Sequence, residues 1–387
     1  MEPVCGLCCF DLEKYSMLPI PIVISVVARA IQFQSDVLQG LACCVDEVVM
    51  LQFYLSQSKI LSDHLRYVVE YCQVNGIPHT AFEKLQPERI APGDAVVSCY
   101  SKVIEELEEK RSQVFKVLLP HNLTGLKGTP YSIVDADLCV ISGKLILKNN
   151  GIDRNNRRFV IGGYAKWDTI FHERFNIGRR RQEIANDAGL DLTVPWIVFY
   201  PTAPNQLFRG NQRRAIPIYE KIRDDIGPCE FIFCLHYNIC QSREAQQAVR
   251  KFQSYARVRR GVRCFDGSRA LELITACDLF ISDIASTMIT AISMDKPVLF
   301  IKARYNFEAP RWRLENVADF QCGTFFGNVD NIGAFLDGYE TPDALKNLLR
   351  CCIAYDDTQS CERIIEIILN RYQQWQDDRL DLSVEPS

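Results

Sequence analysis

Two histidines and one hydroxyl-rich segment carry the side chains best suited to chemistry in this sequence. His121 follows the apolar run 114–119, and His236 follows the apolar run 230–235. The chain has only five histidines, and an imidazole can accept a proton from a hydroxyl group near neutral pH. Both are therefore catalytic candidates. The plainer alternatives are a surface-loop position for His121 and local hydrogen bonding for His236.

The hydroxyl-rich segment lies between an apolar run, 279–281, and a helical pattern, 288–294. It places Asp283, Ser286 and Thr287 where a buried strand ends and a helix begins. Hydroxyl groups and free backbone N–H groups at a helix start suit a pyrophosphate group. The same residue types also cap helices without any ligand, so capping is the alternative to phosphate binding.

Two further patterns are weaker. Thr202 lies in a proline-braced turn after the apolar run 196–200, and an ordinary turn is its plainer interpretation. Asp135 and Asp137 form a D-x-D pattern of the metal–nucleotide type. Residues 134–142, however, echo residues 275–282, and each copy places an Asp before an apolar run that ends on Ser. We therefore predict a positional role for Asp137 and for its counterpart Asp278.

Short apolar runs alternate with helical patterns along both halves of the chain. The predicted strands are 21–28, 47–53, 94–98, 114–119, 137–142, 196–200, 230–235, 262–265, 279–281 and 298–301. The predicted helices are 30–42, 60–74, 102–113, 214–225, 245–255, 268–276, 288–294 and 341–376. This alternation is typical of βαβ units and parallel sheets. We predict an α/β fold with two Rossmann-like, doubly wound domains facing a cleft, where ligands bind outside the carboxyl ends of the strands.

A chain of 387 residues is long for one hydrophobic core, which favours two domains. We predict an N-terminal Rossmann-like domain in residues 1–165, with residues 1–17 as a candidate disordered segment. A C-terminal Rossmann-like domain is predicted in residues 166–340, followed by C-terminal helices and a tail in residues 341–387.

Residues 150–185 connect the two halves and are rich in arginine. The arginines are Arg154, Arg157, Arg158, Arg174, Arg179, Arg180 and Arg181. A solvated helix face is the plain interpretation, and a positive wall near an anionic substrate or a membrane surface is the alternative. The net charge of −4 argues against a dedicated nucleic-acid-binding protein.

The seventeen cysteines lie mostly inside apolar runs, where a cysteine behaves as a small hydrophobic residue. Cys5 and Cys8 have C-x-x-C spacing, but no second pair accompanies them, so a metal site is not predicted. The longest apolar stretch, 17–28, contains two prolines and is too short to span a membrane. We expect a protein of the reducing cytoplasm.

The segment 276–301 resembles the CDP-glycerol glycerophosphotransferase family, the teichoic-acid polymerase type, whose fold is GT-B. The family pattern there reads roughly ADxLITDYSSxxFDxxxLxKPVxFY. The matching residues here are Asp283, Ser286, Lys296 and Pro297. Ile284 and Ala285 replace the usual Tyr and Ser, which removes one phosphate-binding hydroxyl.

Four other segments resemble family motifs in the same order along the chain. Residues 121–127 resemble WHGxxLK, 163–168 resemble GxPRxD, 199–202 resemble the start of LYAPTWR, and 234–237 resemble KxHP. Gly323 falls where the family has Pro-Gly. Every motif is altered somewhere, so the resemblance is to a distant member whose substrate need not be CDP-glycerol.

The resemblance implies roles for the candidate residues. His121 would be the general base on an acceptor hydroxyl, and His236 would be a catalytic residue that also holds the donor diphosphate. The other implied donor-binding residues are Thr202, Asp283, Ser286 and Thr287. The implied acceptor-binding residues are Lys127 and Lys166. GT-B enzymes commonly need no metal, so no metal or other cofactor is expected.

The function expected from the resemblance is a transferase of cell-surface polymer synthesis. It would move glycerophosphate, a polyol phosphate or a sugar from a nucleotide-diphosphate donor to a glycan or polyol-phosphate acceptor. A CDP-linked donor is favoured and a UDP-linked donor is the second choice. No nucleic-acid partner is expected, and the basic connector leaves open a peripheral contact with the inner face of the membrane. The alternatives are a nucleotide-sugar epimerase or hydrolase, and a non-catalytic binding protein derived from the same fold.

Overall fold

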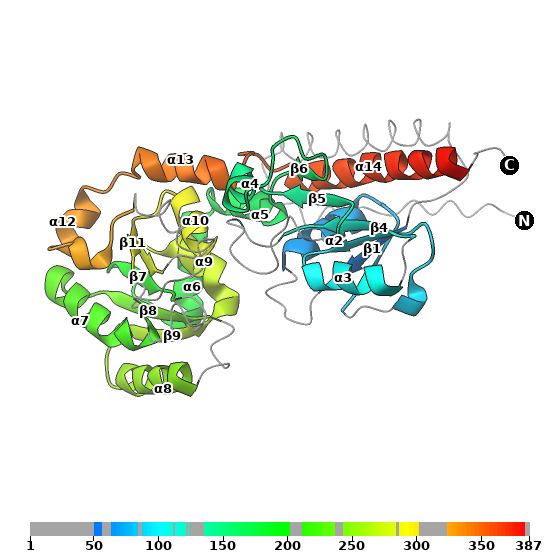
Figure 1. Cartoon of the computed structure of the whole chain (residues 1–387). Coiled ribbons are helices and arrows are strands. Elements are labelled where there is room, and N and C mark those ends of the chain that lie inside the picture. The colour runs from blue at the N-terminus through cyan, green and yellow to red at the C-terminus, as the bar shows by residue number, and fades with distance from the viewer. Residues whose placement is uncertain are drawn as a thin grey trace, which may run out of the picture.

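The computed structural model describes residues 50–55, 63–83, 87–110, 113–120, 123, 135–201, 211–236, 243–283, 286–301 and 323–383. These residues form two lobes that lie side by side, each with a parallel sheet at its centre (Figure 1). The predicted α/β fold with two Rossmann-like domains is confirmed. The cleft stays a prediction, because the segments expected to line it lie largely outside the described residues.

Within the described residues, the N-terminal sheet has six parallel strands in the order β2-β1-β3-β4-β5-β6. The strands are β1 (Leu51–Tyr54), β2 (His79–Phe82), β3 (Ala95–Ser98), β4 (Phe115–Leu118), β5 (Leu138–Ile141) and β6 (Phe159–Ile161). The helices of this part of the chain are α2 (Asp63–Val74), η2 (Pro87–Arg89), α3 (Ser101–Lys110), α4 (Lys144–Asn149) and α5 (Ala165–Glu173).

The part of the C-terminal sheet that the structure describes has five parallel strands in the order β11-β10-β7-β8-β9. The strands are β7 (Trp196–Phe199), β8 (Glu230–Leu235), β9 (Val262–Asp266), β10 (Leu279–Ser282) and β11 (Val298–Phe300). The helices packed on one face are α6 (Ile177–Ala188), α9 (Ala270–Ala276), α10 (Ser286–Ser293) and α13 (Asp343–Cys352). The helices on the other side are η3 (Asn211–Arg214), α7 (Ala215–Ile226), α8 (Arg243–Arg257) and α12 (Ile332–Asp337). Two further short helices are η5 (Gly267–Arg269) and η6 (Phe326–Asn328).

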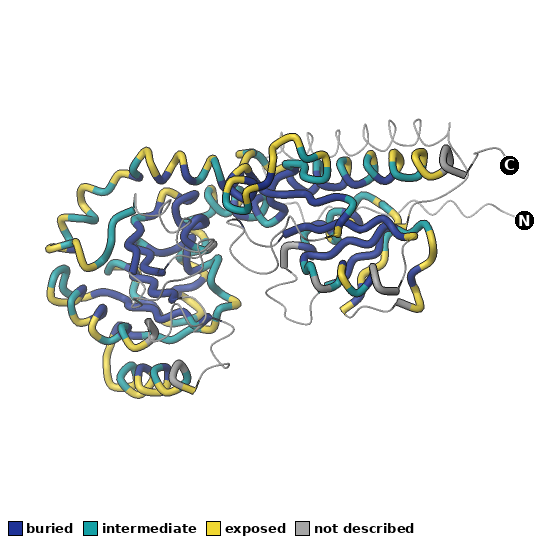
Figure 2. Tube along the Cα trace, viewed as in Figure 1, coloured by how far each residue is buried: buried dark blue, intermediate teal, exposed yellow. Residues whose placement is uncertain are grey.

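Burial explains which strands the sequence could predict. Strands β1, β3, β4, β5, β7 and β10 are buried along their whole length, as Figure 2 shows for the centre of each lobe. Strands covered on both faces are continuous apolar runs, and each fully buried Phe contributes about 1.5–3 kcal/mol to stability. Strand β2 was not predicted, because it is partly exposed and begins with two polar residues. Strand β6 was not predicted either, because its apolar run is only three residues long.

The end of the chain returns to the N-terminal lobe. The last helix, α14 (Ser360–Ser383), packs against α2 and α5, with Ile364, Ile365 and Ile368 buried in the N-terminal core. The prediction of one helical region over 341–376 is therefore wrong at 353–359, where the chain crosses from α13 to α14 without a helix.

The start of α14 is held by a buried carboxylate on α5. The side chain of Asp168 accepts the backbone N–H groups of Ser360 (3.0 Å) and Cys361 (3.0 Å). These are among the N–H groups that a helix start leaves without an internal partner. Burial raises the pKa of Asp168 above its usual value, and the two backbone hydrogen bonds act in the opposite direction.

The positional role predicted for the two echoed aspartates is confirmed. The Asp137 carboxylate accepts the backbone N–H of Lys116 on β4 (2.7 Å). The Asp278 carboxylate accepts the backbone N–H of Trp196 on β7 (2.8 Å) and also binds the guanidinium of Arg181 (2.8 Å). Each aspartate thus ties the segment before its own strand to the beginning of a neighbouring strand.

The connector predicted over 150–185 contains regular structure instead, namely β6, α5 and most of α6. Its arginines on α6 are paired with carboxylates. Arg179 lies 3.6 Å from Glu183, Arg180 lies 2.7 Å from Glu173, and Arg181 binds Asp278. These three side chains therefore serve the fold and form a compensated helix face, as the plain interpretation held.

Candidate functional site

The carboxyl ends of β7, β10 and β11 meet at one edge of the C-terminal sheet, which we call the carboxyl edge. The Tyr200 amide donates to the Ile281 carbonyl (2.9 Å), and the Ile301 amide donates to the Ser282 carbonyl (2.9 Å). The Ser282 hydroxyl also donates to the Tyr200 carbonyl. Because these hydrogen bonds continue beyond the strands, side chains on this edge are held by rigid elements, which favours a precise site.

His236 lies at this edge, directly after β8. Only 8% of the residue is exposed, and its ring centroid lies 5.8 Å from that of Tyr200 at an interplanar angle of 40°. Tyr200 follows β7, the strand that pairs with β8, so two adjacent strand ends hold the two rings together. The predicted strand-end position of His236 is confirmed. A buried imidazole beside a strand end is suited to hold an anion or to transfer a proton.

The start of α10 lies at the same edge and has an unused hydroxyl group. Asp283 is fully buried directly after β10, and α10 begins at Ser286 with Thr287 in its first turn, as predicted. The Thr287 oxygen is buried and has no hydrogen-bond partner among the described residues. Buried hydroxyls almost always have a partner. Together with the free N–H groups of the first helical turn, this hydroxyl offers hydrogen bonds to a phosphate group.

Apolar packing against α9 and α13 holds α10 in place. Met288, Ile289 and Ile292 are buried in the core that α10 shares with α9 and α13. Lys296, one of the residues that match the family pattern, is buried, and its ammonium group donates to the Cys277 carbonyl (3.0 Å). The Lys-Pro pair before β11 therefore positions the strand and the helix, and Lys296 does not point to a ligand.

The other predicted site residues stay predictions. His121, Lys127 and Thr202 lie outside the described residues, as does the side chain of Ser286. Lys166 is the second residue of α5, a helix that packs against α2 and α14. Its proposed contact with an acceptor is not tested by this position.

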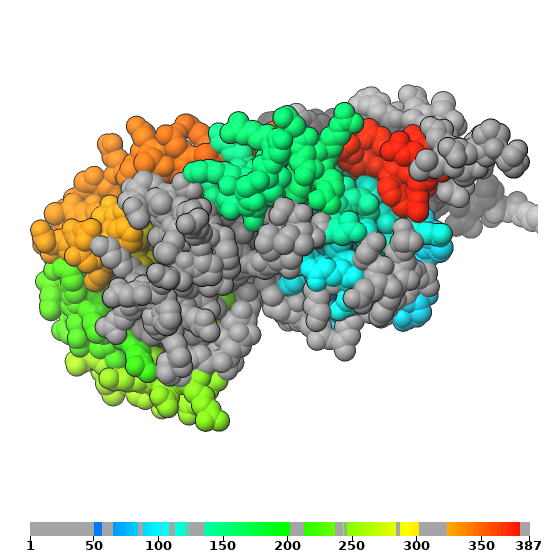
Figure 3. All heavy atoms as spheres, viewed as in Figure 1, coloured from blue at the N-terminus to red at the C-terminus, as the bar shows by residue number. Residues whose placement is uncertain are grey.

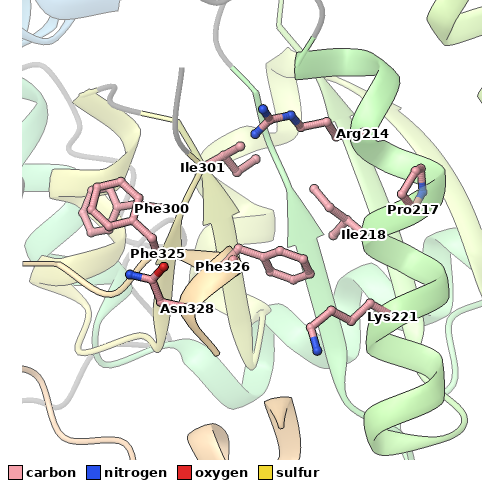
Figure 4. Close-up of a pocket in the computed structure, with 10 residues that line it drawn as sticks. Arg214, Pro217, Ile218, Lys221, Phe300, Ile301, Phe325, Phe326 and Asn328 are labelled. Atoms are coloured by element: carbon pink, nitrogen blue, oxygen red, sulfur yellow. The ribbon is translucent and has the colours of Figure 1, made fainter. Parts of the chain in front are cut away.

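A pocket of about 480 Å³ adjoins the carboxyl edge beside β11 (Figure 4). The residues that line it are Arg214, Pro217, Ile218, Lys221, Phe300, Ile301, Phe325, Phe326, Gly327 and Asn328. Arg214 and Ile301 lie at the same end of the pocket in Figure 4. Since the Ile301 amide binds Ser282 at the carboxyl edge, this end of the pocket lies next to the candidate site.

The chemistry of this pocket is aromatic with a cation at one end. The ring of Phe326 extends toward α7, and the guanidinium of Arg214 lies near the end of β11 (Figure 4). Lys221 is engaged elsewhere, since its ammonium group binds the Asp225 carboxylate (3.0 Å) and the Asp330 carbonyl (3.1 Å). A pocket with aromatic rings along it and a guanidinium at one end suits a planar heterocycle that carries an anionic group.

Sequence reasoning missed this pocket because three distant segments form it. A weak signal was Gly323, which falls at a glycine of the family pattern. A side chain at Gly323 would overlap the ring of Phe300, so the glycine lets the segment after it approach β11. The contact itself is visible only in the folded chain.

The described cysteines behave as core residues. All of them except Cys264 and Cys351 are buried, and burial raises the pKa of Cys229 to about 11 and that of Cys277 to about 12. Thiols with raised pKa values are poor nucleophiles near neutral pH. The pair Cys5 and Cys8 lies outside the described residues. Among the described residues, no three His, Cys, Asp or Glu side chains gather where they could hold a metal ion.

None of the helices in the described ranges has both the length and the apolar character needed to cross a membrane.

Comparisons with known proteins identify the fold class. No protein-family model and no curated protein matches this chain. Among solved structures, the wall teichoic acid polymerase TagF is similar over 86% of this chain and 90% of its own, with 13% identity and a TM-score of 0.53. A variant of TagF is similar over 95% of this chain and 100% of its own, with 14% identity and a TM-score of 0.56.

A second kind of enzyme has a similar structure. The UDP-GlcNAc 2-epimerase from Neisseria meningitidis, bound to UDP-GlcNAc, is similar over 83% of this chain and 99% of its own, with 13% identity and a TM-score of 0.52. At such low identities these likenesses show the fold alone. The protein therefore has a GT-B-like fold of two Rossmann-like domains.

Proposed function

We propose that this protein is a GT-B transferase that uses a nucleotide-diphosphate donor. It moves glycerophosphate, a polyol phosphate or a sugar to a glycan or polyol-phosphate acceptor. The observation that carries the proposal is the buried hydroxyl of Thr287 in the first turn of α10, which has no hydrogen-bond partner among the described residues and lies at the same sheet edge as His236. Similar structures include TagF, a wall teichoic acid polymerase, and a 2-epimerase bound to UDP-GlcNAc.

The donor diphosphate would lie at the start of α10. The first-turn N–H groups and the Thr287 hydroxyl would donate hydrogen bonds to its oxygens, and the helix dipole favours negative charge at that end. His236 would hold the same group from the end of β8. The pocket beside β11 leaves room for a heterocycle or another ring of the donor, with Arg214 next to an anionic group.

The reaction is a substitution in which the acceptor oxygen forms the new bond while the bond to the leaving nucleotide phosphate breaks. In this proposal His121 takes the proton from the acceptor hydroxyl. The negative charge that develops on the leaving phosphate is stabilised by α10 and His236. Because such preorganised donors stabilise developing charge well in a water-poor site, the proposal requires no metal, and turnover should persist in excess chelator.

The partner and localisation predictions belong to this proposal. A CDP-linked donor is favoured by the family resemblance and a UDP-linked donor is the second choice, with Lys127 and Lys166 as acceptor-binding residues. A cytoplasmic setting and a peripheral contact with the inner membrane face also stay predictions.

Thermal unfolding with a nucleotide panel tests the proposal first. The chain is unfolded alone and with CDP, UDP, GDP, ADP or CMP. A ligand at about 100 times its dissociation constant adds roughly 2.7 kcal/mol to the stability, which corresponds to a rise of a few degrees in the midpoint. A rise with CDP supports a glycerophosphotransferase-like donor, and a rise with UDP supports a sugar donor. The absence of any rise in a folded sample contradicts the proposal.

The alternative functions are separated by turnover. An epimerase or hydrolase consumes the donor with no acceptor present, whereas the proposed transferase needs an acceptor hydroxyl. A non-catalytic binding protein shows the thermal shift but leaves the donor intact under both conditions.

A further inference from the structure

A second pocket, of about 590 Å³, lies where α4 meets α13, and we call it the junction pocket. The residues that line it are Lys144, Leu145, Leu147, Lys148, Ile152, Arg154, Ala344, Asn347, Leu348 and Cys351. Figure 3 shows the surface of α4 and the following segment, in green, beside that of α13, in orange. Helix α4 follows β5 of the N-terminal sheet, and α13 packs against α10 of the C-terminal lobe. The pocket therefore lies between elements of both lobes.

The charged residues that line the junction pocket are all basic. Lys144, Lys148 and Arg154 line it, and no acidic residue does. Lys144 and Arg154 are exposed and have no ion-pair partner among the described residues. The neighbouring carboxylate of Asp153 accepts the Asn155 amide (2.9 Å). Cations that share one concave surface repel each other weakly in water, and an anion between them removes that repulsion.

The basic residues of α6 are a useful contrast. There, Arg179, Arg180 and Arg181 each have a carboxylate within 4.0 Å. The arginines of α6 are thus neutralised by carboxylates of the same chain. Lys144 and Arg154 of the junction pocket have no such partner among the described residues and can bind an external anion.

The shape and floor of the pocket favour a small molecule over a flat surface. Its volume lies within the range of about 300–1,000 Å³ that is usual for small-molecule sites. Leu145, Leu147 and Leu348 are buried beneath it and give it an apolar floor. Lys and Arg side chains are the common partners of phosphate groups. A ligand with phosphate groups at one end and an apolar or ring portion at the other fits both features.

We propose that the junction pocket binds a small molecule with two or more phosphate groups, and that this ligand holds α4 against α13. The backbone around the pocket already links the lobes, since the Ala354 amide donates to the Ser142 carbonyl (3.0 Å). Leu145, Leu348 and Met288 belong to one continuous core. The bound ligand thus stabilises the arrangement that supports α10. This site is separate from the donor site proposed above and does not depend on it.

Binding of inorganic tripolyphosphate to the full chain, measured by titration calorimetry, tests the proposal. Binding is expected for the native chain, and the double variant Lys144→Ala with Arg154→Ala is expected to weaken it by roughly tenfold or more, because two charged partners are lost. The matched control is Lys251→Ala with Arg257→Ala, which removes the same charges from exposed positions on α8. The control variant is expected to bind like the native chain.

A thiol-labelling experiment locates the bound ligand. Cys351 lines the junction pocket, and Cys264 on β9 is the other partly exposed cysteine of the described residues. Tripolyphosphate is expected to slow alkylation of Cys351 at least about threefold and to leave Cys264 unchanged, as measured on the separate peptides by mass spectrometry.

Three results would overturn the proposal. The first is that Lys144→Ala with Arg154→Ala binds tripolyphosphate as tightly as the native chain. The second is that the α8 control, Lys251→Ala with Arg257→Ala, loses as much tripolyphosphate affinity as the junction-pocket variant. The third is binding to phosphatidylglycerol vesicles, abolished by Lys144→Ala with Arg154→Ala, without binding of tripolyphosphate. That result would assign this surface to a membrane instead. Loss of nucleotide binding in Thr287→Val concerns only the proposed donor site and leaves the junction pocket unaffected.

Discussion

The segments after β5 and after β10 begin alike and end differently. In both, an aspartate before the strand holds a neighbouring strand, and the buried strand leads into Ser and then a helix. Asp137 and Ser142 occupy these places in the N-terminal lobe, and Asp278 and Ser282 occupy them in the C-terminal lobe. The sequence echo is therefore a structural echo.

The end of β5 is covered by the chain itself. The Ser142 carbonyl accepts the Ala354 amide, and Gly143 lies so close to the carbonyl groups of Cys351 and Cys352 that a Cβ atom there would be 2.5–2.6 Å from them. Helix α4 is short, with six residues. The Ser142 hydroxyl is also buried and has no hydrogen-bond partner in the part of the chain that the structure describes. Here, however, the backbone of residues 351–354 covers the strand end.

The end of β10 has a different neighbourhood. Helix α10 begins there with Ser286 and Thr287, and His236 lies at the same sheet edge. An unpartnered hydroxyl alone does not define a site, as Ser142 shows. The β10 end differs in two further features. Its helix, α10, is longer than α4, with eight residues, and the buried imidazole of His236 lies at the same sheet edge as the Thr287 hydroxyl.

The largest effect is expected for His236→Ala. Turnover of the donor should fall by roughly 10²–10³-fold, the usual cost of removing one group that stabilises the developing charge, while the fold is retained. His79→Ala on β2 is the control, because His79 belongs to the opposite lobe, where its ring nitrogen lies 2.8 Å from the Ile77 carbonyl. Unchanged turnover of a folded His236→Ala protein would remove His236 from the proposed site.

Gly143→Ala should produce the largest loss of stability. Its Cβ atom would meet backbone oxygens that cannot move independently, so we expect a decrease of about 1–3 kcal/mol in the free energy of unfolding, measured by urea denaturation. Gly178→Ala on α6 is the matched control. No atom lies within 4 Å of its added Cβ, and alanine in a helix is favoured by about 0.5–1 kcal/mol. A stable Gly143→Ala protein would show that the β5 end is not tightly covered.

Thr287→Val should separate ligand binding from stability. Valine keeps the shape and removes a buried hydroxyl without a partner, so the free energy of unfolding should stay the same or rise slightly. Nucleotide affinity, measured by calorimetry, should fall by roughly tenfold, because a hydrogen bond to a charged group contributes about 1.5–3 kcal/mol.

Two controls complete that test. Thr287→Ser keeps the hydroxyl and should keep most of the affinity. Ser142→Ala removes the corresponding unpartnered hydroxyl at the β5 end and should not alter affinity. If Ser142→Ala and Thr287→Val weakened nucleotide binding equally, the two strand ends would not differ in function.

The smallest effect is expected for the pH dependence of stability that Asp168 causes. Its carboxylate holds the start of α14, which follows the segment that covers β5. Burial raises the pKa of Asp168 in the folded protein above its unfolded value of 3.8, so the folded state binds this proton more tightly. The resulting stability is fully present below pH 3.8 and is lost as the pH rises through the folded pKa. Asp168→Asn removes this titration, so its stability relative to the native chain should improve over that window in urea denaturation. A constant difference between the two proteins would contradict the raised pKa.

The sequence by itself determined the architecture and the position of the best-described site residues. Buried strands of a parallel sheet are continuous apolar runs, so β7, β8 and β10 were predictable from residue types alone. The strand ends then followed, and with them His236, Asp283 and Thr287. The shared positional role of Asp137 and Asp278 was also predictable, because both segments have the same order of residues: an aspartate, an apolar run and a serine.

Only the tertiary structure decided which of these residues have partners. Pairing of Arg181 with Asp278, approach of Cys351 to Gly143 and return of α14 to the N-terminal lobe join residues far apart in the chain. The pocket beside β11 and the junction pocket likewise combine separate segments. Local sequence patterns report periodicity and burial. Charge compensation, close backbone contact and pocket shape depend on distances between segments that local patterns do not specify.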